Sequence, residues 1–315
     1  MAEPLGSIHV VAAVITDRRG RVLLARRGDG RDLAGLWEFP GGKREAGESS
    51  ESALVRELQE ELGITVQVGE PLIEVPQQYP DKRLRLEVRR VGSWSGTARG
   101  QEGQALAWVV PEKLGRYPMP PADRPVVAAL LQTDRYLITP EPSGDGGQWL
   151  AQLADALAAG ARRVQLRARG MTQAEWQSLA AEAVSRCRKA GAEVLVNGDL
   201  ELAQALGVGL HLRASQLGQH TSLFMEGGLL AASCHDADEL RAAQALGCDF
   251  VVLGPVRATA THPEAKPMGW KEFARLRESV SLPIYALGGL VPTDIPEARR
   301  HGAQGIAAIR GLWPD

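Results

Sequence analysis

The stretch GKREAGESSESALVRELQEELGI occupies residues 42–64 and joins a glycine-led loop to a helix-forming run. Leucines recur every four residues in this run, and the period predicts a helix with one buried face: Leu54, Leu58 and Leu62. Beside that face the helix carries three acids at spacings of three and four residues: Glu57, Glu60 and Glu61. Their charges repel each other, and a hard cation such as Mg²⁺ would offset the repulsion. The stretch predicts a metal site, with a solvated acidic face as the alternative.

Composition limits the class of protein. The chain has 315 residues, 44% hydrophobic content and a formal net charge of −2, which suit a soluble globular protein with room for two domains. Three cysteines without C-x-x-C spacing argue against disulfides and a zinc site. The charge favours neither a nucleic-acid partner nor a membrane surface. Because we find no signal sequence and no apolar run of the ~20 residues that span a membrane, we expect a cytoplasmic location.

Residues 1–133 are predicted to form a small α+β domain around this helix. A hairpin is expected from Ile8–Thr16 and Val22–Ala25, because Arg18-Arg19-Gly20 forms a turn signal between them. Further strands and a closing helix are expected at 65–68, 84–91, 105–110 and 124–131.

Residues 134–315 show a different pattern, in which short apolar strands alternate with helical segments. The expected strands are 136–139, 163–167, 193–197, 209–212, 229–234, 250–254, 283–287 and 305–309. Eight such units predict a closed (β/α)8 TIM barrel, in a compact version because the span is short for that fold.

The first domain resembles the MutT-like Nudix hydrolases. The resemblance covers residues 7–131 and rests on the pattern G-x5-E-x7-R-E-L-x-E-E-x-G-I from Gly42, on LWEFPGGK at 36–43 and on PPADRPV at 120–126. It implies a hydrolase that uses Mg²⁺, with Mn²⁺ as an alternative, and converts 8-oxo-dGTP to the monophosphate and pyrophosphate.

The resemblance also implies roles for individual residues. Catalysis is assigned to Glu57 as general base, with Glu48 and Arg56. Metal ligands are expected from carboxylates and from a backbone carbonyl of the glycine loop: Gly41, Gly42, Glu57, Glu60, Glu61 and Glu102. Nucleotide contacts are expected from Arg27, Glu38, Phe39, Pro40, Gly41, Lys43, Lys82 and Asp123. Within this set, Arg27 and Lys43 are expected to face phosphates.

Asp123 is the residue we expect to choose the base. A carboxylate accepts from two donors, and guanine presents N1–H and an exocyclic amine side by side. This complementarity favours guanine over adenine. The alternative is that Asp123 caps the helix that begins at Arg124.

The second domain resembles the thiamin phosphate synthase and TenI group of compact barrels. Matching motifs follow the predicted strands, and in such a barrel this is the face that carries binding sites. The candidate residues are Gln165, Arg167, Arg169, Asn197, His235, Gly288 and Gly289. The synthase pattern places magnesium-binding aspartates at 198 and about 216 and a lysine near 262. This chain has Gly198, Gln216 and His262 there, which speaks against synthase activity.

Three interpretations of the two domains remain open. The first is nucleotide-pool sanitation with an attached TenI-like barrel. The second is a thiamin-directed fusion that hydrolyses a thiamin-related pyrophosphate, whose barrel is a thiazole phosphate tautomerase using His235 for proton transfer or a module binding a thiamin-related phosphate. The third treats the barrel as a non-catalytic sensor or scaffold.

Overall fold

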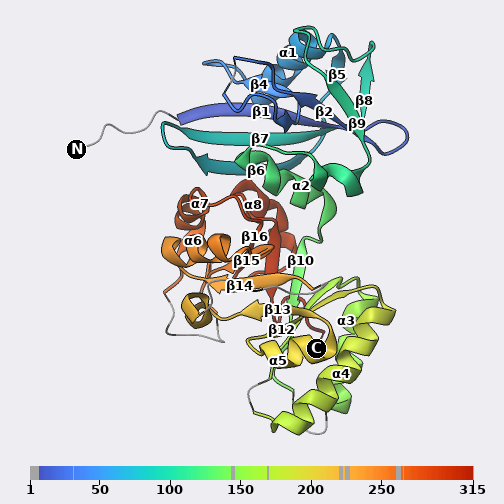
Figure 1. The fold of residues 1–315 in the computed structure, drawn as a ribbon, viewed down its shortest axis with the longest axis vertical. Helices are drawn as coiled ribbons and strands as arrows, with labels where there is room; N and C mark the ends of the chain where they lie inside the picture. Colours follow the sequence, from blue (N-terminus) through green and yellow to red (C-terminus); the bar gives the residue numbers. More distant parts are fainter. Residues whose placement is uncertain are drawn as a thin grey trace, which may run out of the picture. The chain divides into compact units, whose positions relative to one another are not determined.

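The computed structural model describes residues 7–30, 32–142, 146–168, 170–219, 223, 228–259, 264 and 266–314. Arg169 and His262, both named above, lie outside these residues. The chain forms two compact units that divide after Gln132 (Figure 1). The first is an α+β domain and the second is a closed parallel barrel.

The first domain is built on three small sheets. The largest has the strand order β4-β1-β7-β6, with β4 at Gly41–Lys43, β1 at Ser7–Ile15, β7 at Arg83–Val91 and β6 at Pro71–Gln78. The second has the order β3-β2-β9, at Trp37–Glu38, Val22–Arg26 and Leu106–Val109. The third pairs β5 at Thr65–Gln67 with β8 at Ser93–Ser95. Strand β1 runs parallel to β7 and antiparallel to β4.

Two helices cover β1 from opposite sides, because successive strand residues point to opposite faces. Val11, Ala13 and Ile15 belong to the hydrophobic cluster of α1, at Ser50–Leu62. Ala12 and Val14 belong to the cluster of α2, at Arg124–Leu131. Short 3-10 turns at Pro111–Arg116 and Pro121–Asp123 precede α2. Strand β1 is therefore buried on both faces at the centre of the domain.

The expected hairpin is confirmed only at its turn. Thr16 and Val22 form an isolated antiparallel bridge there, but β1 and β2 then belong to different sheets. The sequence analysis also missed β6, where Pro76 lies within the strand, and it treated β4 as part of a loop. Proline signals a strand edge or break, and β6 is indeed an edge strand of its sheet.

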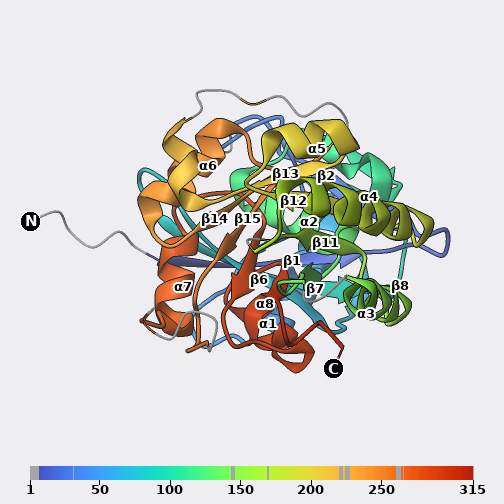
Figure 2. The same ribbon diagram turned by 90° about the horizontal axis from the view of Figure 1, so that it is seen from below.

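The predicted barrel is confirmed. Its strands pair in sequence order from β10 to β17 and close into a ring: Arg135–Ile138, Arg163–Leu166, Glu193–Asn197, Gly209–Leu212, Leu230–Cys234, Phe250–Leu253, Ile284–Leu287 and Gly305–Ala308. Helices α3 to α8 lie outside these strands (Figure 2): Gly147–Ala158, Gln173–Lys189, Leu200–Leu206, Ala237–Leu246, Gly269–Arg277 and Ile295–Arg300. A short 3-10 turn, Ala214–Gln219, follows β13.

Aromatic and polar side chains fill the barrel interior. Tyr136, Phe250 and Tyr285 meet there, with ring centroids 5.2 to 5.8 Å apart. The hydroxyl of Tyr136 is hydrogen-bonded to Nδ1 of His211 at 3.1 Å, and Nε2 of His211 to Ser233 Oγ at 2.9 Å. Burial lowers the pKa of His211 to about 3, so its ring is neutral. This interior is a packed core.

Among the residues described, we find no helix with the length and apolar character needed to cross a membrane.

Candidate active site

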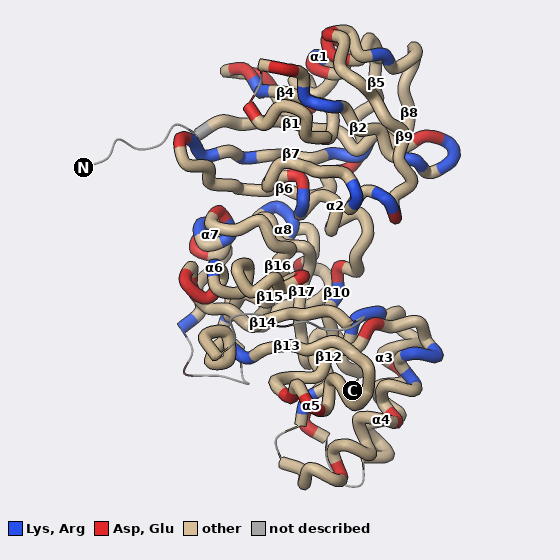
Figure 3. The backbone as a smooth tube through the Cα atoms, viewed as in Figure 1, with Lys and Arg blue, Asp and Glu red and all other residues tan. Residues whose placement is uncertain are grey.

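Helix α1 has clear start and stop signals that fix its register. The Oγ of Ser49 accepts from the backbone N–H of Ser52 at 3.1 Å, and Gly63 ends the helix with φ 67°. The predicted leucine face is buried in the adjacent cluster. Because this face is fixed, the acids lie along the adjacent side of α1. Figure 3 marks the acidic residues of α1 in red.

Glu57 lies against the glycine pair of β4. A methyl group on Gly42 would overlap the Glu57 carboxylate. Gly41 has φ 150°, and a methyl group there would overlap the backbone carbonyl of Val11 on β1. The two glycines are therefore required for different reasons. Gly41 lets β4 approach β1, and Gly42 leaves room for the carboxylate.

Arg56 joins three of the carboxylates. Its guanidinium donates to Glu48 from Nε and Nη2, each at 3.0 Å, and from Nη1 to Glu57 at 2.9 Å and Glu60 at 3.2 Å. It also donates to the carbonyl of Lys43 at 3.1 Å. Because Arg56 donates hydrogen bonds to the carboxylates of Glu48 and Glu57, its own pKa is raised, and these bonds in turn lower the pKa of Glu48.

This arrangement bears on two predicted catalytic residues. Glu48 and Arg56 are not among the described residues that line the pocket below. Arg56 contacts Glu57 and Glu60 directly, and Glu48 contacts Arg56, so the catalytic assignment of Glu48 and Arg56 stays a prediction.

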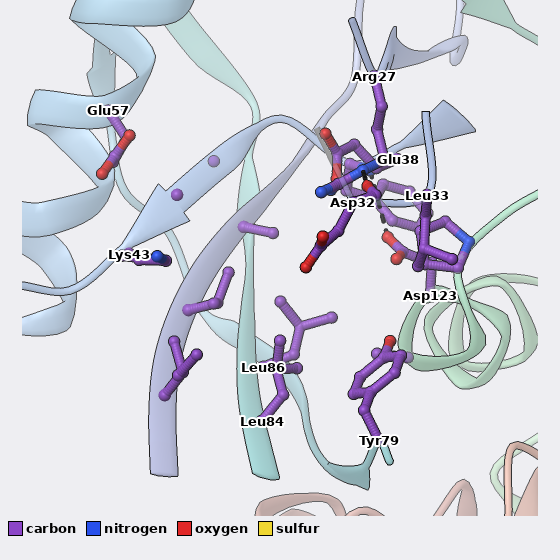
Figure 4. Close-up of a pocket in the computed structure, with 18 of the residues that line it drawn as sticks. Arg27, Asp32, Leu33, Glu38, Lys43, Glu57, Tyr79, Leu84, Leu86 and Asp123 are labelled. Carbon is purple, nitrogen blue, oxygen red and sulfur yellow. Dashed lines mark hydrogen bonds and ion pairs between the residues drawn. The ribbon is translucent and has the colours of Figure 1, made fainter. Parts of the chain in front are cut away.

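Glu57, Glu60 and Glu61 line one pocket with a volume of about 760 Å³ (Figure 4). Such a volume is suited to a ligand of nucleotide size. Most of the predicted site residues line it: Arg27, Glu38, Phe39, Gly41, Gly42, Lys43, Glu57, Glu60, Glu61, Lys82, Glu102 and Asp123. Pro40 is not among its described lining residues. The Pro40 carbonyl accepts from the Ala13 backbone, and its assignment as a nucleotide contact stays a prediction.

The two ends of the pocket carry different groups. Glu57 and Lys43 lie at the end next to α1, whereas Asp123 lies with Arg27 and Glu38 at the other (Figure 4). Arg27 forms an ion pair with Glu38 and donates from Nε to the Asp32 carbonyl at 2.6 Å. Arg27 lines the pocket at the end away from α1, and the expectation that it faces phosphates stays a prediction.

Asp123 is buried, with 6% of its surface exposed. Its Oδ1 accepts from the backbone N–H of Phe39 at 3.3 Å, and its side chain forms no capping bond to α2. Asp123 does end the 3-10 turn and occupies the N-cap position of α2, so only a capping bond from its side chain is ruled out. Burial, followed by the nearby Glu38 carboxylate, raises the pKa of Asp123 to about 7. Near neutral pH this side chain therefore exists both as an acceptor-only carboxylate and as a carboxylic acid with one donor.

The sequence analysis missed the apolar wall of the pocket. Ile8 and Val10 on β1 pair in register with Leu84 and Leu86 on β7, and all four line the pocket. The alternation of apolar and charged residues in β7 was the available signal, but it does not say which cavity the apolar face borders. Tyr79 completes the wall beside Asp123 (Figure 4).

A loop at the rim was also missed. Asp32 forms an ion pair with Lys82 across the pocket, and both residues line it. The next residue, Leu33, has φ 58° and is 44% exposed although it is a large apolar side chain. No sequence pattern distinguishes this segment from an ordinary polar loop.

The barrel candidates have varied surroundings. Gln165 is buried in the interior and donates to Tyr136 Oη at 3.2 Å, so it contributes to the core. Arg167 and Asn197 are half-buried where β11 and β12 end. His235 is exposed and ion-paired with Glu239 at 3.0 Å.

The glycine pair of the barrel has a packing reason of its own. A methyl group on Gly288 would lie 2.7 Å from Pro255, and one on Gly289 would lie 2.7 Å from the Ala258 carbonyl. Both glycines also have positive φ, at 110° and 63°. Close packing against the segment after β15 therefore explains them without a bound phosphate.

Comparisons with known proteins match both domains. The NUDIX domain model matches residues 11–129, and the thiamine monophosphate synthase model matches residues 135–312. CTP pyrophosphohydrolase of Escherichia coli is 46% identical over 124 residues, covering 39% of this chain and 91% of the relative. The 8-oxo-dGTP diphosphatase of the same organism is 37% identical, covering 39% and 95%. A putative thiamine-phosphate synthase of Geobacter sulfurreducens is 34% identical, covering 57% and 86%.

The chain therefore belongs to the Nudix family through its first domain and to the thiamine monophosphate synthase family through its second. Its first domain is a Nudix hydrolase domain with an acidic helix opening into a nucleotide-sized pocket.

Nudix hydrolases generally use a divalent metal, usually Mg²⁺. The expected ligands fit such a cation chemically, because carboxylates and backbone carbonyls are hard oxygen donors. The absence of a side chain at Gly42 also leaves the Glu57 carboxylate close to β4. Within the described part of the chain, however, no three acidic, histidine or cysteine side chains form a ready-made metal cluster. A divalent cation bound by the α1 carboxylates would compete with Arg56 for Glu57 and Glu60.

Proposed function

We propose that the first domain hydrolyses nucleoside triphosphates to the monophosphate and pyrophosphate, with a preference for oxidised guanine nucleotides such as 8-oxo-dGTP. The observation that carries this proposal is the single pocket that joins the carboxylates of α1 to the buried Asp123. The 8-oxo-dGTP diphosphatase relative supports the same assignment.

The charge distribution of the pocket suits a triphosphate. A bound divalent cation, Mg²⁺ or Mn²⁺, would neutralise the charge that develops on the phosphoryl oxygens. Lys43 faces the phosphates from β4, and among the described residues it has no ion-pair partner to compete with them. Glu57 removes the proton from the attacking water as general base, a role that requires a carboxylate held in a fixed position.

The opposite end recognises the base. The apolar wall formed by Ile8, Val10, Leu84 and Leu86 borders the ring. Ionised Asp123 accepts from N1–H and the exocyclic amine of guanine, which no adenine edge supplies in this form.

Product analysis in ¹⁸O-labelled water tests the reaction. Attack at the β-phosphorus should place the label in pyrophosphate and leave the nucleoside monophosphate unlabelled. Label in the monophosphate would contradict the site of attack, and release of inorganic phosphate with a nucleoside diphosphate would contradict the reaction itself.

A cytosine nucleotide is the second candidate substrate. The pKa of Asp123 supports this candidate, because burial and the nearby Glu38 carboxylate raise that pKa to about 7. The protonated acid offers one donor and one acceptor, which complement the N3 acceptor and the amino donor of cytosine. The 46% identical relative is a CTP pyrophosphohydrolase.

For the barrel we propose a binding module for a thiamin-related phosphate. The family match and the cationic residues that follow β11 and β13, Arg167 and Arg213, support it. A calorimetric titration of the full chain with thiamin phosphate tests this proposal, and the absence of binding would contradict it.

A further inference from the structure

An arginine occupies the place where the barrel family's metal-binding acids are expected. Gly198 directly follows β12 with φ 67°, and a methyl group there would lie 2.6 Å from Nε and 2.8 Å from Cζ of Arg213. The guanidinium therefore fills the space that any side chain at position 198 would need.

The second expected acid position lies beside the first. Nε2 of Gln216 donates to the Gly198 carbonyl at 3.0 Å, and Oε1 of Gln216 accepts from the Arg213 backbone N–H at 3.0 Å. Positions 198 and 216 are thus brought together as expected for two ligands of one ion, but both are neutral. With a guanidinium between them, these residues do not fit a divalent cation, because the arginine would repel it.

The Arg213 side chain is available to a ligand. Arg213 is exposed, and it forms no ion pair with any residue that the structure describes. It follows β13 at the carboxyl end of the barrel strands, the end where such barrels bind ligands. Asn197, the last residue of β12, precedes Gly198, and its buried Oδ1 has no hydrogen-bond partner among the described residues. The site therefore offers a guanidinium that no described acid neutralises.

We propose that Arg213 binds the phosphate or pyrophosphate group of the barrel's ligand directly, in place of a divalent cation. The inference rests on the proposed role of the barrel in binding a phosphorylated ligand. A guanidinium presents parallel N–H donors that match two phosphate oxygens, whereas a metal would need carboxylates that positions 198 and 216 lack. The barrel site is then independent of metal, unlike the site of the first domain.

Calorimetric titration of the full chain with inorganic pyrophosphate and with inorganic phosphate, in excess EDTA, tests the proposal. We expect wild-type protein to bind at least one of the two anions without metal. Arg213→Ala should weaken binding by about tenfold or more, the range for a lost charge-assisted hydrogen bond. Arg213→Lys should lie between, because lysine keeps the charge and loses the fork. Arg275→Ala, which removes an exposed arginine of α7, is the matched control and should bind as wild type does.

Lys43→Ala removes the phosphate contact proposed for the first domain, and the Arg213-dependent part of the metal-free signal should persist in it. Three results would overturn the proposal: no binding in EDTA, equal binding by Arg213→Ala and wild type, or a signal that Lys43→Ala abolishes. Circular dichroism verifies that each variant is folded. Nucleotide hydrolysis with Mg²⁺ should be the same in wild type and Arg213→Ala. A failure of the anion-binding proposal is therefore distinguishable from a failure of the proposed hydrolase function.

Discussion

The carboxylate of Glu57 lies in the space that Gly42 leaves by having no side chain. This contact links the glycine loop to the acidic helix, since the first supplies β4 and the second supplies the general base that we propose. The spacing of the signature is thereby explained physically, because the strand must pass directly under the carboxylate.

Substituting the two neighbouring glycines should separate catalysis from folding. In Gly42→Ala the methyl group meets only the flexible end of Glu57, so we expect kcat to fall by about 100-fold, as for a catalytic group misplaced by 1 Å, with little change in Tm. In Gly41→Ala the methyl group meets the rigid Val11 backbone. We expect this variant to lose about 2 kcal/mol or more of stability, which lowers its Tm by several degrees. Thermal melting and steady-state kinetics measure both. A Gly42→Ala enzyme with normal kcat would contradict this role of Gly42.

Removing Arg56 should make stability depend on a divalent cation. Arg56→Ala leaves the carboxylates of Glu48, Glu57 and Glu60 without their shared counterion, and we expect a loss of stability of up to about 1 kcal/mol in EDTA. Mg²⁺ should restore part of this loss, because it binds the same acids. Melting with and without Mg²⁺ measures the effect, with the exposed Arg116→Ala as control. Equal destabilisation in both buffers would show that Arg56 does not neutralise a metal-binding cluster.

Asp123→Asn should be more stable than wild type at alkaline pH. In the folded protein the pKa of Asp123 is about 7, whereas an unperturbed carboxyl has a pKa near 3.8, so the folded state holds its proton to higher pH than the unfolded state does. Wild-type stability from this group is present below pH ~4 and is lost as pH rises to ~7, by an amount on the order of 4 kcal/mol. Asparagine cannot ionise and lacks this loss. Urea unfolding at pH 5 and pH 8 measures it, and equal pH dependence of the two proteins would contradict the raised pKa.

Base preference should change over the same pH range. Glu38 and Arg27 form an ion pair beside Asp123, whose pKa of about 7 lies in this range. As pH rises through 7, the acid loses the donor that suits cytosine and becomes the acceptor that suits guanine. We therefore expect kcat/KM for 8-oxo-dGTP relative to CTP to rise with pH in wild type. The ratio should stay flat in Asp123→Asn, and a pH-dependent ratio in that variant would assign the effect to another group.

Much of this account could be predicted from the sequence, because the decisive residues follow regular patterns. The period of Leu54, Leu58 and Leu62 fixed α1, and eight apolar runs were enough for the barrel. The β1–β2 hairpin was confirmed only at its turn, because local turn signals do not reveal that the strands join different sheets. The contacts of Arg27 were beyond sequence reasoning, since they depend on which carboxylate lies within reach. The same limitation applies to Arg213, whose importance emerges only when Gly198 and Gln216 come together.

The most direct test of the central claim is kcat/KM for 8-oxo-dGTP against dGTP, CTP and thiamin pyrophosphate with Mg²⁺. Activity that remains in Glu57→Gln measures contaminating phosphatase. Glu70→Gln is the matched control, because it makes the same substitution at an exposed acid that is not among the described pocket residues. We predict the highest kcat/KM for 8-oxo-dGTP and a loss of about 100-fold or more in Glu57→Gln only. A preference for thiamin pyrophosphate, or activity that survives in Glu57→Gln, would contradict the account.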